Sequence, residues 1–383
     1  MRIAFYPLKE SPDHPNTLTE QVIMESLIKT LQLDNNIFLI PNEFNGSDNK
    51  RYEKEDMSPS IDGEREANNK IRKLKRLPVN QRPQIWITYN LNVLSPDSLG
   101  PKISSALNIP YIIIGAKYSK KHLNSSNTQN LSVIAQQISH ADVLLSFSYE
   151  ETSTLIPIKS SKTKIIDLPP FVDFSIYEKL REKRVEIRQR ISKKYNLCIS
   201  RPWLVTVAML NPGNNLASYR LLGRSLWLIN KPNFNLLIVG EGPAQKLVKE
   251  SFKDLEVGIV AWIGKQGKSN ILEILTACDI YVWPGYNEYC PIQFLMSQAA
   301  GLPVITGGFP GATKIIQNSK TGNIIIPWDD ADFAESIVRI CDDKSSREKM
   351  SSSAIKMVRE NHSLFIAKKI LNQAMSDAFK NKN

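Results

Sequence analysis

The sequence predicts an α/β protein whose chain folds into two successive domains, each built on a parallel sheet covered by helices. Its 383 residues exceed what one ordinary hydrophobic core organises. Short apolar segments alternate with helical patterns along both halves, which is typical of parallel strands buried on both faces. The alternation is interrupted at Leu168-Pro169-Pro170-Phe171-Val172-Asp173, where two prolines can continue neither a strand nor a helix. We therefore expect a domain boundary near residue 173.

The first half contains six apolar segments of strand length. A helix after the first of them is indicated by Thr17 and Glu20, which have the spacing of a capping box. Another helix is expected to begin at Ser95-Pro96, because an N-cap residue followed by proline is a common helix start. The polar segment 42–62 is expected to be a loop. The predicted strands are 3–6, 37–40, 85–89, 111–114, 143–146 and 164–166.

The second half repeats the pattern after a charged helix expected over residues 177–195. Ligands of such sheets bind outside the carboxyl ends of the strands, so the expected site is a cleft between the domains. We predict an N-terminal domain over 1–173, a linker helix and C-terminal domain over 174–361, and a C-terminal helix, 362–383, that packs back toward the N-terminal domain. The predicted strands are 204–209, 235–239, 258–262, 280–283, 304–306 and 323–326, and the closing helices are 331–341 and 364–380.

The composition, 42% hydrophobic and 23% charged, is that of a globular protein, and no apolar run has the roughly 20 residues of a membrane span. Neither the four cysteines nor the four histidines have metal-ligand spacing, so no metal is expected. The cysteines do not suggest a disulfide framework either, so a reducing cytoplasm is the expected location.

The net charge of +11 includes basic runs at 70–76 and 179–194. These basic runs suit either a solvated surface or binding to an anionic partner, such as the inner face of a membrane. Nucleic acid is not expected, because no aromatic residues are interleaved with the basic run.

The strongest candidate for a functional site lies between residues 279 and 328. An apolar strand is followed by Asn287-Glu288, and Cys290-Pro291 then opens a helix. A helix start at the end of a parallel strand favours an anion such as a diphosphate. Glu288 is placed to accept hydrogen bonds from sugar hydroxyls, and it equally suits a carboxylate stabilised by the helix dipole.

Two glycine-rich turns are open to two interpretations. Gly240-Glu241-Gly242-Pro243 joins a strand to a helix, as either a phosphate cradle or a plain turn. The segment 307–311, which precedes the helix bearing Lys314, suits a ligand loop or a chain reversal.

Four blocks of the second half resemble the C-terminal domain of family-four retaining glycosyltransferases, which have the glycosyltransferase B fold of two Rossmann-like domains facing across a cleft. The blocks are "LLIVGEGP", "VAWIGKQ" with "ILEILTACDIYVWP", "NEYCPIQFLMSQAAGLPVITGG" and "KTGNIIIPWDDADFAESI". The resemblance covers about residues 203–342 and is looser in the first half, at "MRIAFYPL", "RPQIWITYN", "NIPYIII" and "ADVLLSFS". It implies transfer of a sugar from a nucleotide sugar to a glycan or glycolipid acceptor, with retention of configuration, in polysaccharide or glycoconjugate assembly. Such enzymes typically need no divalent metal, and no cofactor beyond the nucleotide-sugar co-substrate is expected.

The resemblance assigns roles to individual residues. Glu288 would orient the donor sugar as the catalytic candidate, and Asn211, Asn214 and Asn215 would bind phosphate. Gly264 would line the base pocket. The remaining donor-site candidates are Gly240, Gly242, Asn287, Cys290, Ile292 and Met296.

Several family positions are substituted. A second glutamate, which holds the ribose, is replaced by Met296, and the loop 209–215 lacks the cations that bind diphosphate. Any compensating charge would come from Lys117, Lys265, Lys268 or Lys314. The alternatives are therefore an active transferase and a catalytically impaired pseudo-glycosyltransferase that acts as a binding or scaffold subunit. A third, another sugar-nucleotide enzyme such as an epimerase, lacks its expected acid–base cluster.

Overall fold

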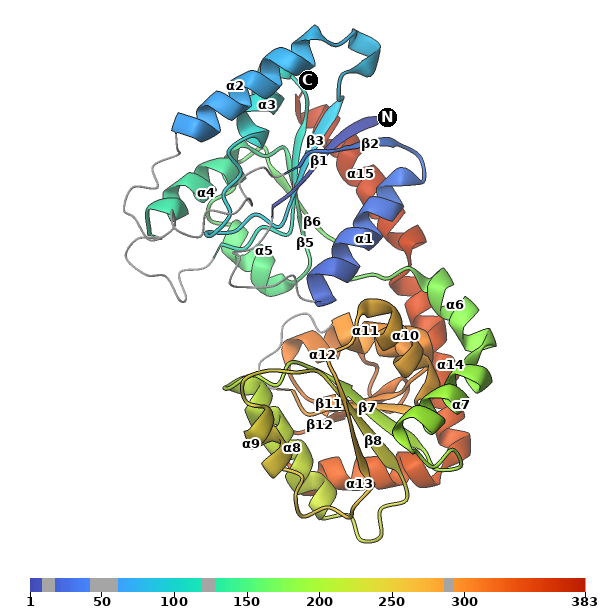
Figure 1. Cartoon of the computed structure of the whole chain (residues 1–383). Coiled ribbons are helices and arrows are strands. Elements are labelled where there is room, and N and C mark those ends of the chain that lie inside the picture. The colour runs from blue at the N-terminus through green and yellow to red at the C-terminus, as the bar shows by residue number, and fades with distance from the viewer. Residues whose placement is uncertain (9–17, 42–60, 119–127, 286–291, 383) are drawn as a thin grey trace. The chain divides into compact units, whose positions relative to one another are not determined.

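The structure, a computed structural model, describes residues 1–8, 18–41, 61–118, 128–285 and 292–382 (Figure 1). The chain forms two compact units. Unit 1 comprises Met1–Pro169 with Leu364–Asn383, and unit 2 comprises Pro170–Ser363. Each unit has its own six-stranded sheet in which every pairing is parallel, so the predicted α/β class with two Rossmann-like sheets is confirmed.

Unit 1 has the strand order β2-β1-β3-β4-β5-β6. Helices α1 and α15 cover one face of the sheet, and α2, α3 and α4 cover the other (Figure 1). Every residue of β3, β4 and β5 is buried, which explains their continuous apolar sequences. The elements are β1 (Arg2–Pro7), α1 (Leu18–Gln32), β2 (Asn36–Leu39), α2 (Ile61–Arg76), β3 (Ile85–Tyr89), α3 (Gly100–Leu107), β4 (Tyr111–Ile114), α4 (Thr128–His140), β5 (Val143–Ser146), α5 (Tyr149–Leu155), β6 (Lys164–Asp167) and α15 (Leu364–Lys382).

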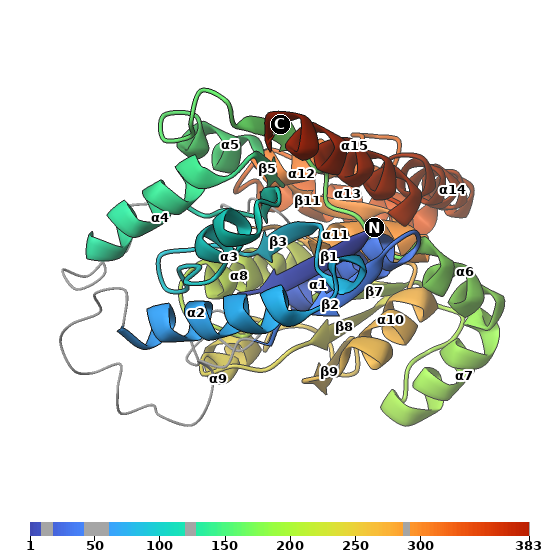
Figure 2. The same ribbon diagram turned by 90° about the horizontal axis from the view of Figure 1, so that it is seen from above.

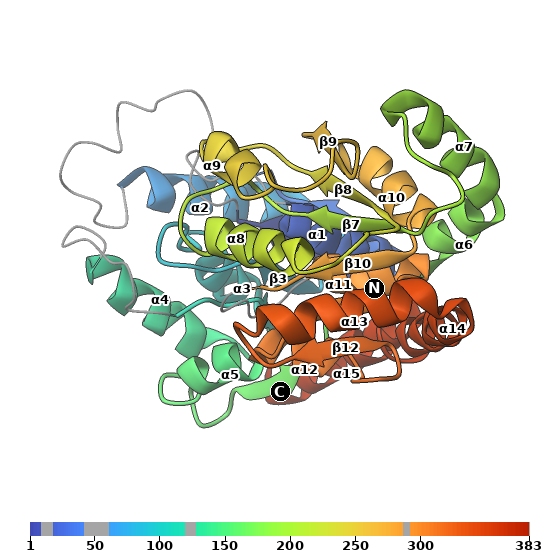
Figure 3. The same ribbon diagram turned by 90° about the horizontal axis from the view of Figure 1, so that it is seen from below.

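Unit 2 has the strand order β12-β11-β10-β7-β8-β9. Helices α8, α9 and α13 lie on one face (Figure 3), and α10 packs beside α7 on the other (Figure 2). The elements are α6 (Phe174–Glu182), α7 (Arg184–Tyr195), β7 (Trp203–Val207), α8 (Asn214–Trp227), β8 (Asn235–Val239), α9 (Gln245–Glu250), β9 (Val260–Gly264), α10 (Lys268–Ala277), β10 (Ile280–Trp283), α11 (Ile292–Ala300), β11 (Val304–Gly307), α12 (Pro310–Ile315), β12 (Gly322–Ile325), α13 (Asp330–Asp342) and α14 (Lys344–Asn361).

Two expectations about helices are corrected, and one helix was missed. The helix expected over 177–195 is two helices separated at Lys183. The helix expected from Ser95 begins at Gly100, because the buried carboxylate of Asp97 accepts the N–H groups of Leu99 and Gly100 and holds the preceding turn. Helix α14 was not predicted. The expected loop 42–62 lies mostly outside the described residues, and α2 begins at its end.

Much of the second basic run serves the packing of unit 2. Arg184 and Arg188 donate to opposite oxygens of Asp279, at 2.6 and 2.9 Å, and Asp279 also accepts the N–H of Trp203 at 2.8 Å. The Arg188 guanidinium lies 4.0 Å from the centre of the Trp203 ring. These contacts join α7 to the first and fourth strands of the unit, so the arginines there are structural.

None of the helices in the described part of the chain has the length and apolar character needed to cross a bilayer.

Candidate functional site

The strand order of unit 2 reverses direction between β7 and β10, which are paired neighbours. In doubly wound sheets a ligand crevice forms at this point, between the loops that leave the carboxyl ends of the two strands. The loop after β7 is described throughout, whereas the loop after β10 is described as far as Gly285. The candidates Asn287, Glu288 and Cys290 therefore lie outside the described residues.

The loop after β7 is fastened to the loop after β8. The N–H of Leu210 donates to the carbonyl of Glu241 at 3.0 Å, and the N–H of Ala244 donates to the carbonyl of Leu210 at 2.8 Å. A Cβ atom on Gly240 would overlap the Ala208 carbonyl, and one on Gly242 would overlap that of Leu210. Close packing of two backbones therefore requires both glycines, whatever else they contact.

The three asparagines after β7 have different environments. The side-chain amide of Asn215 donates to the Met209 carbonyl at 2.7 Å, so it stabilises the loop. Asn211 accepts the N–H of Leu216 through its backbone carbonyl. Asn214 is exposed as the first residue of α8, behind Gly213, which has φ +78° and open space around its missing side chain. The start of α8 is thus accessible at the switch point, with the positive end of a 14-residue helix facing outward.

The two candidates on α11 belong to the core. Ile292 and Met296 both have an exposed fraction of 0%. The same helix packs its Phe294 ring against Tyr281 and Phe309, with ring centres 5.6 and 6.0 Å apart. A carboxylate at position 296 would therefore be buried, at a desolvation cost.

The candidate lysines differ in how their charge is balanced. Lys265 forms an exposed ion pair with Glu241 at 2.9 Å. Lys314 is exposed on α12, and Lys268 is the first residue of α10. Lys117 belongs to unit 1, where its ammonium is 4.0 Å from a carboxylate oxygen of Glu20. Lys265 is therefore already paired with a carboxylate of the loop after β8.

Gly264, the candidate for the base pocket, ends β9 with φ +73° and has no atom within 4 Å of the position of a Cβ. Its carbonyl accepts the N–H of Gly240 at 3.0 Å. The position of a side chain at residue 264 is therefore open among the described residues.

Unit 1 contains a perturbed carboxyl that the sequence did not single out. Glu151 stands in the first turn of α5, where its N–H donates to the Ser148 hydroxyl at 3.1 Å and its Oε2 accepts the N–H of Phe147 at 2.7 Å. Its Oε1 is buried and has no hydrogen-bond partner among the described residues. Burial raises the pKa of Glu151 to about 7, against an opposing attraction from Lys117. The spacing of Ser148 and Glu151 in the sequence indicates a helix cap, but the burial of the Glu151 carboxyl depends on the fold.

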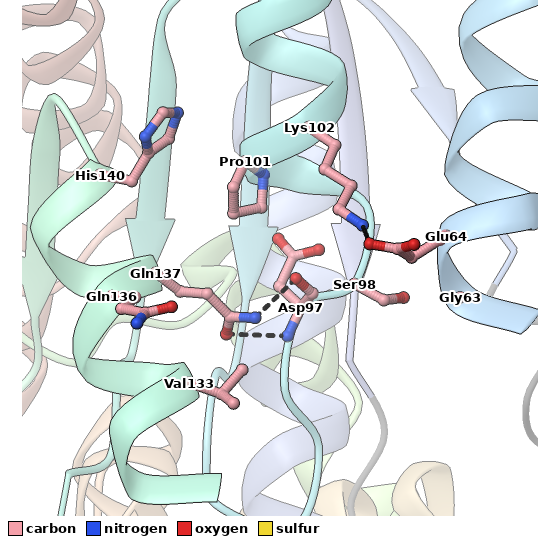
Figure 4. Close-up of a pocket in the computed structure, with 10 residues that line it drawn as sticks. All are labelled: Gly63, Glu64, Asp97, Ser98, Pro101, Lys102, Val133, Gln136, Gln137 and His140. Atoms are coloured by element: carbon pink, nitrogen blue, oxygen red, sulfur yellow. Dashed lines mark hydrogen bonds and ion pairs between the residues drawn. The ribbon is translucent and has the colours of Figure 1, made fainter. Parts of the chain in front are cut away.

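A cavity of about 360 Å³ lies between α2, α3 and α4 of unit 1 (Figure 4). The structure places no group of three or more histidine, cysteine, aspartate or glutamate side chains suited to a metal ion within the residues it describes.

Comparison with known proteins identifies the relationship. Residues 191–357, which lie within unit 2, match the sequence model of the family described as glycosyl transferases group 1. In this region the chain is similar to the group 1 glycosyltransferases. The matched region contains the switch point, both glycine turns and α11, so the donor-site candidates of unit 2 all fall inside it.

Among curated relatives, D-inositol 3-phosphate glycosyltransferases from Corynebacterium efficiens and Stackebrandtia nassauensis are each 23% identical, over 58% and 70% of this chain. The alignments span 54% and 62% of those proteins, which is less than two thirds of their length. A glycosyltransferase from Rickettsia africae has a similar fold, with a TM-score of 0.73 at 17% identity over 99% of both chains. An Anabaena protein, HepE, solved in complex with UDP, has a TM-score of 0.66 at 15% identity over 98% of this chain and 100% of that one.

Proposed function

We propose that this protein is a glycosyltransferase that binds a nucleotide sugar in unit 2 and transfers the sugar, with retention of configuration, to a glycan or glycolipid acceptor bound at unit 1. The observation that carries the proposal is that the family match coincides with the unit whose switch point leaves the start of α8 open. The relatives with glycosyltransferase names and the fold neighbour that binds UDP support the same substrate class. Polysaccharide or glycoconjugate assembly at the cytoplasmic side of a membrane is the proposed setting, with no metal required.

In this proposal the start of α8 holds the diphosphate, in place of the family's cations. The N-terminus of a helix presents free N–H groups and about half a positive charge. Gly213 leaves room for the phosphates, and the bond between Asn215 and the Met209 carbonyl keeps the loop in place. This arrangement supplies less charge than a pair of basic side chains, so we expect modest donor affinity.

A charge change at the α8 start tests the donor site. Isothermal calorimetry of UDP-, GDP- and ADP-sugars on the intact protein is expected to find one that binds. Asn214→Asp should weaken that binding about tenfold, because a new carboxylate beside the diphosphate opposes it by roughly 1.4 kcal/mol. The helix itself tolerates aspartate in its first turn.

Asn230→Asp is the matched control, since exposed Asn230 lies just beyond the other end of α8 and its change adds the same charge. Equal weakening by both variants would mean a general charge effect. Failure of every nucleotide sugar to bind would contradict the transferase proposal and favour a scaffold role. Once a donor that binds is known, NMR can follow its slow hydrolysis by the protein. Release of the sugar first in the same anomeric configuration as in the donor would support retention.

The first basic run suits an anionic membrane surface, and we propose that α2 makes this contact. Residues 67–83 contain no acidic side chain. Arg82 donates to the carbonyls of Leu77 and Lys75, at 2.8 and 2.6 Å, and so closes the end of the helix. Val79 beyond it is 73% exposed. The four exposed cations near this end are Arg72, Lys73, Lys75 and Arg76.

Neutralising those four cations to glutamine should lower binding to vesicles containing phosphatidylglycerol at least a hundredfold, since each contributes roughly 1 kcal/mol near an anionic surface. Cosedimentation with such vesicles measures the loss. A second variant that neutralises four exposed lysines of unit 2 carries the same change in net charge and should bind normally. The role of α2 would be refuted if both variants lost vesicle binding equally. It would also be refuted if the parent protein bound neutral vesicles as well as anionic ones. The control lysines are Lys320, Lys344, Lys349 and Lys356.

A further inference from the structure

The cavity of unit 1 is separate from the switch point of unit 2. All its described lining residues come from α2, α3, α4 and the turn before α3. One end is closed by His140, whose Nε2 is 3.0 Å from the Ser105 hydroxyl and whose ring centre is 6.1 Å from that of Tyr111. Tyr111 is the first residue of β4, so the cavity extends along a sheet face toward the amino end of the strands.

The floor of the cavity is rigid. Both oxygens of the Asp97 carboxylate are fully engaged: Oδ1 accepts two backbone N–H groups, and Oδ2 accepts the hydroxyls of Thr88 and Tyr111. The side-chain amide of Gln137 clasps the Asp97 backbone, accepting its N–H at 3.1 Å and donating to its carbonyl at 2.8 Å (Figure 4). A pocket with such a floor is formed before any ligand arrives, which lowers the cost of binding.

The charged side chains that line the cavity already have partners. Lys102 on α3 forms an ion pair with Glu64 on α2 at 2.7 Å, across the rim shown in Figure 4. Burial lowers the pKa of His140, which favours the neutral imidazole at pH 7. Asp97 is already saturated with hydrogen bonds. No cation among the described lining residues is left for a phosphate, and no carboxylate is left for a metal ion.

The remaining polar groups match hydroxyls. The Ser98 hydroxyl and the Gln136 amide can each donate and accept a hydrogen bond, as a sugar hydroxyl does. Pro101 and Val133 supply apolar contacts suited to the C–H groups of a sugar ring. The volume, about 360 Å³, is at the small end of the range for ligand pockets and suits a unit of one or two rings.

We infer that this cavity, formed by residues of unit 1 alone, is a second carbohydrate site that holds a neutral sugar unit of a glycan. The choice of sugar as the ligand rests on the proposed sugar transfer, whereas the site itself rests on the geometry of unit 1. Its role is to keep a glycan acceptor bound to the enzyme between transfers, because a second, weaker contact slows the release of the glycan.

Saturation-transfer difference NMR with neutral saccharides tests the site on the full-length protein. Glucose, galactose, N-acetylglucosamine and their disaccharides serve as probes, with inorganic phosphate as the anionic probe. Gln136→Trp, on the exposed side of α4, should fill the mouth and weaken saccharide binding at least tenfold, and Ser98→Ala should weaken it several-fold. Gln81→Trp, at an exposed position of the same unit, is the matched control and should bind like the parent protein.

The outcomes separate this inference from the transfer itself. Saccharide signals that Gln136→Trp removes, while nucleotide-sugar binding is unchanged, support the second site. Saccharide binding with no nucleotide-sugar binding would support the site and refute the proposed transfer. Absence of saccharide signals, signals that both tryptophan variants leave intact, or displacement by phosphate would overturn the inference.

Discussion

Replacing Asp97 by alanine is expected to lower the free energy of unfolding of unit 1 by about 3–5 kcal/mol. The carboxylate is 1% exposed and accepts four hydrogen bonds. Its removal leaves the hydroxyls of Thr88 and Tyr111 and two backbone N–H groups buried without an acceptor, next to Trp86, whose indole N–H donates to Thr88 at 3.0 Å. Each orphaned group costs roughly 1–3 kcal/mol, and partial rearrangement brings the sum below simple addition.

Hydrogen exchange of peptides from β3, α3 and β4 measures this loss for unit 1 separately from unit 2. Asp34→Ala is the control, because Asp34 is an exposed partner of Lys368, at 2.8 Å, and such pairs contribute at most about 1 kcal/mol. Protection in β3 and β4 that survives Asp97→Ala would show that the network does not stabilise unit 1. The loss of stability in Asp97→Asn should lie between the losses in Asp97→Ala and Asp34→Ala, because the asparagine amide oxygen still accepts some of these hydrogen bonds.

Replacing Glu151 by glutamine is expected to remove a pH dependence of the stability of unit 1. The ordinary pKa of this side chain is 4.5, and burial raises it to about 7 in the folded protein. Between these values the folded carboxyl retains a proton that the unfolded chain has lost, so stability falls as pH rises through this window and levels off above it. The difference amounts to about 3 kcal/mol. Glutamine cannot ionise and still accepts the Phe147 N–H.

The glutamine variant should therefore match the parent near pH 4.5 and exceed its free energy of unfolding by about 3 kcal/mol at pH 8. Urea denaturation from pH 4.5 to 8, followed through hydrogen exchange in β5 and α5, gives the two profiles. Glu150→Gln, the neighbouring residue, changes the same charge and should keep the parent's slope. If the Glu151→Gln variant kept the parent's dependence of stability on pH, the titrating group would be another residue.

The sequence was sufficient for the sheets and for the family resemblance. Strands such as Ile85–Tyr89 and Ile280–Trp283 are bounded where the apolar residues begin and end, because residues buried on both faces must be continuously apolar. Helix boundaries were less predictable. Ser95-Pro96 has the local signature of a helix start, yet the distant partners Thr88 and Tyr111 place the Asp97 carboxylate so that the helix starts later.

Most candidate residues of the donor site were assigned through the family resemblance, which gives no information about burial in this chain. The asparagines after β7 have similar chemistry in the sequence, but the fold turns the Asn215 amide onto the Met209 carbonyl and leaves Asn214 exposed. Lys265 is a cation in the sequence, and its pairing with Glu241 depends on the meeting of two loops.

The sequence by itself determined the two parallel sheets, the order of their strands along the chain and the region related to glycosyltransferases, because these depend on local apolar patterns and on motif spacing. Only the tertiary structure decided which polar groups are buried, paired or open. The raised pKa of Glu151, the fully hydrogen-bonded carboxylate of Asp97 and the cavity beside it arise from segments far apart in the chain. Burial and pairing depend on distances between such segments, which periodicity along one segment does not contain.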